Sequence, residues 1–234
     1  MLIESLVAEA FATNCYVVAS EPGSECVVVD PGIGVGAALD EVLARHRLTA
    51  VAVLVTHGHL DHTFAVAPVC GARNIPAYVH TDDAVLLSDP WRALPPEMRM
   101  MAEGRLTYTE PDDVARLTDG QSVQLAGLDI RVDHAPGHTP GSVLFGLAGD
   151  DEAPGYCLSG DVLFAGSIGR TDFPGSSEAD MNRSLRDKIL PMNDDIAVLP
   201  GHGPATTIGR ERRTNPFLRR VIDDGHTQAP ARGM

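Results

Sequence analysis

The chain of 234 residues is 44% hydrophobic and 21% charged, which is typical of a soluble globular protein. Its formal net charge of −14 argues against binding nucleic acid, which needs a basic face, and against an anionic membrane surface. No apolar stretch approaches the length of a transmembrane helix, and the amino terminus lacks the basic and apolar regions of a signal peptide.

The four cysteines are widely spaced, lack any CxxC pairing and lie among apolar residues: Cys15, Cys26, Cys70 and Cys157. This pattern predicts buried free thiols in a reducing compartment, so we expect a cytoplasmic protein.

The first half of the chain alternates strands with helices. Strands are predicted at Leu2–Val7, Tyr16–Ser20, Cys26–Val29, Ala50–Val55 and Ile75–Val79. Helices are predicted at Val35–His46, Thr63–Cys70 and Asp82–Ser88. The Pro- and Met-rich stretch from Asp89 to Glu110 predicts a long irregular connection with one short helix.

The second half repeats this strands-then-helices order. Strands are predicted at Ser122–Leu125, Leu128–Val132, Val143–Leu147, Tyr156–Ser159 and Ile196–Leu199. Helices are predicted over Glu178–Leu190 and over Thr206–Asp224, with an interruption at Pro216. We therefore expect two similar halves packed sheet to sheet and covered by helices.

The strand Ala50–Val55 ends in the polar run THGHLDH, which places four metal-ligand side chains within six residues. In an extended segment His57, His59 and Asp61 project to one side, and a turn at Asp61 directs His62 elsewhere. One strand end can therefore serve two adjacent metal ions.

Three further ligand residues follow predicted strands in tight loops, most of them rich in glycine and proline: His138, Asp161 and His202. Taken singly, each reads as a turn residue or an incidental histidine. Because strand ends converge at one edge of a layered sheet, the shared pattern favours a single site. Five histidines and two aspartates suit two divalent ions, with zinc first and iron or manganese as alternatives. Of the other histidines, we expect His80 at the surface and His134 in a structural role.

These motifs carry a family resemblance. THGHLDH, APGHTPGS around His138, SGDVLF around Asp161 and PGHG around His202 resemble the metallo-β-lactamase-fold hydrolases over nearly the whole chain. The stretches GSIGRTDFPG (166–175) and ERRTNPFL (211–218) are similar to the glyoxalase II group, the hydroxyacylglutathione hydrolases, in their short bacterial form.

The resemblance implies an α+β fold, a four-layer αββα sandwich, as a single domain over residues 1–234. It implies two metal sites with a shared carboxylate: His57, His59 and His138 on one ion, Asp61, His62 and His202 on the other, and Asp161 bridging. It also places Asp30 behind the metal loop as a support.

The pocket residues implied by the resemblance are Arg170, Phe173, Arg213 and Asn215. The alternative for the two arginines is a buried ion-pair network with Asp172 or Glu211, with no direct contact to substrate.

The implied activity is hydrolysis of a 2-hydroxyacyl thioester, such as S-lactoylglutathione, by a metal-bridging hydroxide that Asp61 orients and deprotonates. Full-length relatives continue into a basic helical extension that this sequence lacks, so another thiol carrier is an alternative to glutathione. A persulfide dioxygenase with one iron, and a lactonase or β-lactamase, are the alternative activities. The expected partner is this small molecule; the oligomeric state is left open.

Overall fold

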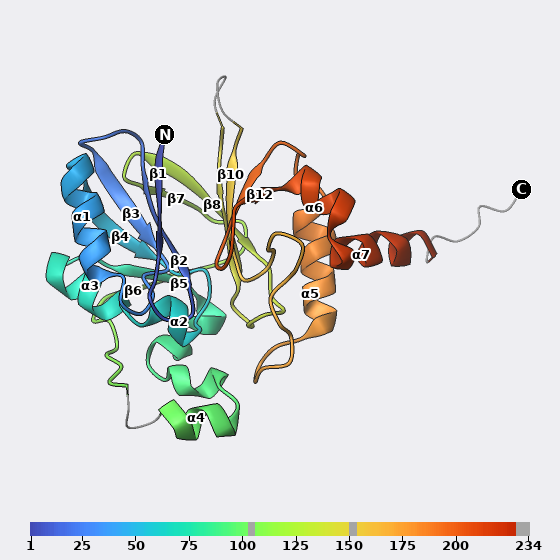
Figure 1. Cartoon of the computed structure of the whole chain (residues 1–234), viewed down its shortest axis with the longest axis horizontal. Helices are drawn as coiled ribbons and strands as arrows, with labels where there is room; N and C mark the ends of the chain where they lie inside the picture. Colours follow the sequence, from blue (N-terminus) through green and yellow to red (C-terminus); the bar gives the residue numbers. More distant parts are fainter. Residues whose placement is uncertain (103–105, 150–153, 228–234) are drawn as a thin grey trace, which may run out of the picture.

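Two β-sheets face each other, and helices cover the outer face of each sheet, so the computed structural model has four layers (Figure 1). It describes residues 1–102, 106–149 and 154–227. Within these residues the first sheet has the order β1 (Leu2–Val7), β2 (Asn14–Ala19), β3 (Glu25–Val29), β4 (Thr49–Leu54), β5 (Ala77–His80), β6 (Val114–Leu117). Its outer helices are α1 (Gly36–His46) and α3 (Val66–Arg73).

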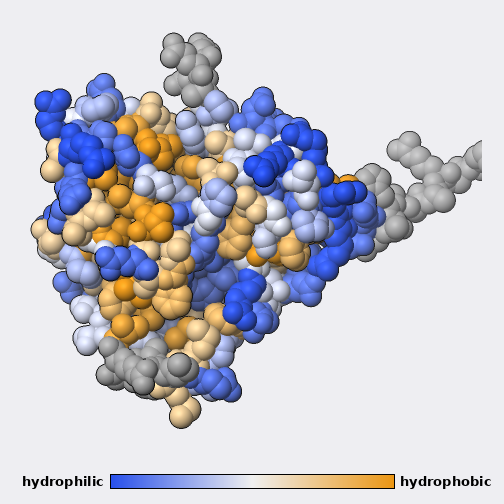
Figure 2. All heavy atoms as spheres, in the orientation of Figure 1, coloured by the Kyte–Doolittle hydropathy of each residue, from blue (hydrophilic) through white to orange (hydrophobic). Residues whose placement is uncertain are grey.

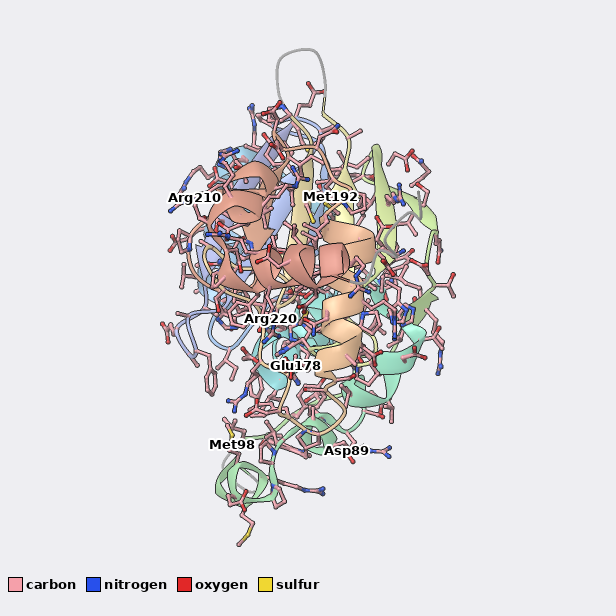
Figure 3. All side chains as sticks on the ribbon, turned by 90° about the vertical axis from the view of Figure 1, so that its right-hand side faces the viewer. Asp89, Met98, Glu178, Met192, Arg210 and Arg220 are labelled. Carbon is pink, nitrogen blue, oxygen red and sulfur yellow. The ribbon has the colours of Figure 1, made fainter. Side chains whose placement is uncertain are left out.

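The second sheet is built from the rest of the chain. Its strands, in spatial order, are β12 (Thr206–Thr207), β11 (Ala197–Pro200), β10 (Tyr156–Gly160), β9 (Val143–Leu147), β8 (Leu128–His134) and β7 (Ser122–Leu125). Its helices are α5 (Glu178–Ser184), continued by the π-helical turn η3 (Leu185–Ile189), α6 (Ile208–Thr214) and α7 (Pro216–Thr227). Figure 3 shows α7 crossing α5, where Arg220 Nη2 lies 2.6 Å from Glu178 Oε1.

Strands buried on both faces explain why the apolar runs are continuous. Along β2, Val17 packs toward the helices of the first sheet, whereas Tyr16 and Val18 pack into the space between the sheets. Leu144 of β9 packs with Met181 in the space between the second sheet and its helices. The three apolar clusters therefore fill the three spaces between four layers.

The expected pair of strands-then-helices halves is confirmed, and four local predictions are corrected. The strand β6 was not predicted, because it has four residues and lies at the sheet edge. The segment predicted as helix from Thr206 begins with β12. The predicted helix at Asp82–Ser88 is the 3₁₀ helix η1 (Thr81–Leu87), and the connection from Asp89 contains two helices, η2 (Pro90–Ala93) and α4 (Pro96–Ala102).

Strand directions place one set of carboxyl ends together. Since β8–β9 and β9–β10 are antiparallel and β10–β11 is parallel, β8, β10 and β11 all run the same way. In the other sheet β3 and β4 are parallel. The ligand motifs follow the ends of β4, β8, β10 and β11, so the fold can gather them at one edge.

The surface is mixed in character. Figure 2 shows apolar residues over the side of the first sheet and polar residues over the side of α6 and α7. Among the exposed large hydrophobic side chains are Val7, Phe11 and Met100. None of the described helices has both the length and the apolar composition needed to cross a membrane.

Candidate metal centre

The structure brings three histidines together from two strand ends. His57 and His59 follow β4, and His138 follows β8. Their ring centroids lie 4.4–4.9 Å apart and their planes cross at 79–89°. All three are buried. Each ring offers a nitrogen, and the three nitrogens lie within 4.8 Å of one another, close enough to be ligands of one ion. We call these residues the first trio.

Asp61, His62 and His202 form a second trio beside the first. Asp61 and His62 lie in the one-turn helix α2 (Leu60–Thr63), and His202 follows β11. His202 Nε2 lies 3.2 Å from Asp61 Oδ2 and 3.3 Å from His62 Nε2. The side chains of Asp61 and His202 are 23% and 27% exposed. Two members of this trio are therefore partly open to solvent, whereas His62 is fully buried.

Asp161 faces both trios. Its Oδ2 lies 3.5 Å from His138 Nε2 of the first trio and 3.5 Å from His202 Nε2 of the second. Its Oδ1 lies 3.4 Å from His62 Nε2. One carboxylate can thus bridge two adjacent ions.

Unpaired buried atoms test whether these residues fit metal ions. His57, His59 and His138 each have a buried Nε2 with no hydrogen-bond partner, and so does Asp161 Oδ1. An unmade buried hydrogen bond costs about 1–3 kcal/mol, so four such atoms aimed into one site need a cation. Imidazole and carboxylate are ligands of zinc, iron and manganese. The residues fit divalent metals.

The electrostatics differ between the two trios. Burial first, and the other histidines second, lower the pKa of His57 well below its usual range and that of His59 to about 3. Burial acts to raise the pKa of Asp61, but the nearby His62 and His202 outweigh it and hold the pKa low. The pKa of Asp161 is also lowered, because its histidine neighbours outweigh burial. His57 and His59 are therefore neutral and the two carboxylates ionised. In the second trio the effect is opposite: burial acts to lower the pKa of His62 and His202, but Asp61 and Asp161 outweigh it and raise both.

Two histidines of the first trio are held from behind at their Nδ1 atoms. His57 Nδ1 lies 3.1 Å from Thr56 Oγ1, and His138 Nδ1 lies 2.8 Å from the carbonyl oxygen of Arg170. Such bonds direct Nε2 to the metal and fix the ring orientation.

Asp30 lies behind the metal loop. Its Oδ2 is 3.0 Å from His62 Nδ1 and accepts a 2.6 Å hydrogen bond from Thr56 Oγ1, while its Oδ1 accepts from the Thr56 backbone N–H at 2.8 Å. Asp30 has a φ of 51°, in the left-handed region that aspartate tolerates. One buried carboxylate therefore supports residues of both trios.

The loop of His202 is held by the opposite half of the protein, which sequence reasoning missed. Asn14 Nδ2 donates to the carbonyl oxygens of Pro200 and Gly203 at 2.9 and 2.8 Å. Tyr16 Oη donates to Pro200 at 2.8 Å. Asn14 and Tyr16 lie in β2, where nothing in the local sequence indicates a contact with the end of β11.

Arg170 and Phe173 lie beside the first trio. The Phe173 ring centroid is 5.8 Å from that of His59, and the Arg170 guanidinium lies 3.9 Å from the Phe173 centroid. Arg170 is also paired with Asp172 through Nε and Nη2, at 2.7 and 2.8 Å. The pair with Asp172 is the one that the ion-pair alternative named, but the Arg170 side chain is 54% exposed, so the pair is not buried.

Arg213 and Asn215 have different surroundings. The Arg213 side chain is 69% exposed and lies 3.8 Å from Asp194, so it too departs from the buried alternative. Asn215 is buried, and its Nδ2 donates to Ser167 O and Glu211 Oε2, both at 3.0 Å. Asn215 thereby supports the loop after β10.

Comparison with known proteins agrees with this geometry. A sequence model described as the metallo-beta-lactamase superfamily matches residues 8–202, a range that ends on the last ligand. The chain belongs to this superfamily. Among its members, a Mycobacterium bovis protein (Mb2612c) is 44% identical over 93% of this chain and 98% of its own. Hydroxyacylglutathione hydrolase GloC of Haemophilus influenzae is 34% identical over 93% and 98%.

Solved structures of the superfamily superpose over most of the chain. The BLEG-1 B3 metallo-beta-lactamase has a TM-score of 0.81 and 39% identity, covering 93% of this chain and 99% of its own. TTHA1623, solved in a di-iron-bound form, has a TM-score of 0.74 and 37% identity, covering 92% and 100%. The four-layer metallo-β-lactamase fold is thus confirmed.

Proposed function

We propose that this protein is a dinuclear metal-dependent hydrolase of 2-hydroxyacyl thioesters such as S-lactoylglutathione. The observation that carries the dinuclear part is Asp161, whose carboxylate lies within 3.5 Å of histidine nitrogens from both trios. The relative named hydroxyacylglutathione hydrolase supports the thioester part.

Zinc is the first choice of metal, and the di-iron form of TTHA1623 supports iron as an alternative. Divalent ions held by the two trios would lower the pKa of a water to about 7 and polarise the thioester carbonyl.

Asp61 is the residue that orients the nucleophile and accepts its proton. Its carboxylate is partly exposed and kept ionised by the facing histidines. Thr13 Oγ1 donates to Asp61 Oδ2 at 3.1 Å and fixes its orientation. A positioned carboxylate of this kind contributes about 10²–10⁴-fold to rate.

Phe173 and Arg170 form an apolar and cationic wall beside the first trio. The exposed guanidinium can attract a carboxylate of the thiol carrier, which matters in a chain of net charge −14. Because Arg170 is already paired with Asp172, its contribution is to orient the substrate more than to bind it tightly.

The test is hydrolysis of S-lactoylglutathione by metal-loaded protein, in parallel with the lactoyl thioester of a second small thiol, a lactone and a cephalosporin. We expect release of free thiol, and we expect Asp61→Asn to lower kcat at least 100-fold in protein shown to retain its metals. Asp40→Asn, the same change on an exposed side chain of α1, is the control. Cleavage of the cephalosporin alone, or oxygen uptake with a persulfide, would contradict the proposal.

The four free cysteines are all buried. Burial raises the pKa of Cys26 to about 11 and that of Cys157 to about 12. A reagent that detects thiols will therefore react with the thiol that hydrolysis releases and not with the cysteines of the protein. Unreactive buried thiols also support our proposal of a reducing, cytoplasmic compartment.

A further inference from the structure

The 3₁₀ helix η1 (Thr81–Leu87) packs closely against both loops that carry the first trio. A Cβ added to Gly58, between His57 and His59, would lie 2.5 Å from Leu86 Cβ. A Cβ added to Gly141, in the loop after His138, would lie 2.5 Å from the backbone nitrogen of Asp83. Each loop thus meets η1 at a glycine, which allows a close approach.

Asp83 lies at this junction and is fully buried. Its Oδ2 accepts hydrogen bonds from the Gly58 N–H at 2.7 Å and from Thr139 Oγ1 at 2.6 Å. Its Oδ1 accepts from the Gly141 N–H at 2.7 Å. One side chain therefore joins the loop of His57 and His59 to the loop of His138.

We propose that Asp83 is a positioning residue that sets the separation of the two loops of the first trio, and with it the affinity of the ion bound there. Both loops direct donors at Asp83, so both of its oxygens must accept. An asparagine has the same shape but carries a donor. In either orientation of its amide, an NH₂ group would face a backbone N–H of one loop.

The second trio does not depend on this junction. His62 is held by Asp30, and His202 follows a loop held by Asn14. The two loops of the first trio also keep a separate link, because the Val143 N–H donates to the Thr56 carbonyl oxygen at 2.9 Å. Loss of the Asp83 carboxylate should therefore disturb one ion and leave the fold intact.

The neighbouring residue Asp82 provides a matched control. It lies with His80 and His134 in a cluster that has the composition of a metal site. The two imidazoles stack face to face at 3.9 Å with planes 11° apart, whereas the rings of the first trio meet edge to face. His134 Nε2 is also 2.7 Å from the Pro140 carbonyl oxygen. We assign no ion to this cluster. His80 is buried, so the expectation that it lies at the surface was wrong.

The test compares Asp83→Asn with Asp82→Asn, the same change one residue away on an exposed side chain. Metal-free proteins are titrated with Co²⁺, with stoichiometry from calorimetry and ligand geometry from the visible spectrum. We expect Asp82→Asn to match the wild type. We expect Asp83→Asn to bind one equivalent normally and the other about 10–100-fold more weakly, with a changed spectrum for that ion.

Equal binding curves and spectra for the two variants would overturn the inference. If Asp83→Asn does not fold, Thr139→Val removes one donor to Asp83, and Thr139→Ser keeps it; we expect weaker binding of one ion only in the valine variant. The inference rests on the two-ion site proposed above. A wild type that binds fewer than two equivalents would contradict that site, whereas a normal wild type with an unaffected Asp83→Asn contradicts only the role of Asp83.

Discussion

At the scale of single residues, the seven ligand side chains differ in which of the two ions they would bind. His59 belongs to the buried first trio and His202 to the partly exposed second trio. Asp161 belongs to both. Removing one histidine from each trio therefore distinguishes a two-ion site from a one-ion site, which separates the hydrolase from an iron dioxygenase using a single ion.

We expect His59→Ala and His202→Ala each to lower the metal content by about one ion per chain and thioester hydrolysis by at least about 100-fold. Metal content is measured by mass spectrometry after loading and desalting. Full metal content in His202→Ala would mean that the second trio holds no ion. His46→Ala, which changes a histidine that ends α1, pairs with Glu4 and belongs to neither trio, serves as the control.

At the scale of elements, the end of α1 carries avoidable strain. The helix ends at His46, and the following residue, Arg47, has a φ of 55°, in the left-handed region where glycine is preferred. The side chain of Arg47 is exposed.

We expect Arg47→Gly to raise the free energy of unfolding by about 0.5–1 kcal/mol, because the left-handed conformation costs a residue with a Cβ about 1 kcal/mol. Arg45→Gly, inside the last turn, should lower it by about 1 kcal/mol. Chemical denaturation measures both changes. A destabilised Arg47→Gly would show that the arginine side chain contributes more than its backbone strain costs.

Features that depend on the sequence of one segment could be predicted, whereas contacts between segments far apart in the chain could not. The ligand residues could be found because each follows an apolar strand and precedes a tight loop. Asn14 and Asp83 have no such pattern. Their partners lie up to 189 residues away for Asn14 and up to 58 for Asp83, so they read as ordinary polar residues until the fold is known. The edge strand β6 was missed because four residues give too short a pattern.

At the scale of the whole molecule, the metal centre joins the two halves. Four ligand residues come from the segment between β4 and the end of α2, and three come from loops of the second sheet. Ions bound there would cross-link the sheets and neutralise part of the net charge of −14.

We therefore expect a strong chelator to lower the melting temperature, and added Zn²⁺ to raise it. Metal that binds only the folded state at 100 times its dissociation constant adds about 2.7 kcal/mol of stability. Thermal unfolding followed by circular dichroism measures the shift. The melting temperature of the Asp161→Asn variant, which lacks the shared carboxylate, should change much less on adding chelator or Zn²⁺. A change as large as in the wild type would show that the stabilising metal binds elsewhere.

The gathering of the ligand loops at one edge leaves the other edge of the sheets available for engineering. The β2–β3 turn lies at the amino end of β3, opposite the end that leads to Asp30. Gly23 in this turn is exposed, and a Cβ there would meet no atom within 4 Å. An affinity tag or surface linker inserted at Pro22–Gly23 would attach the protein to a support with its ligand-bearing edge facing outward.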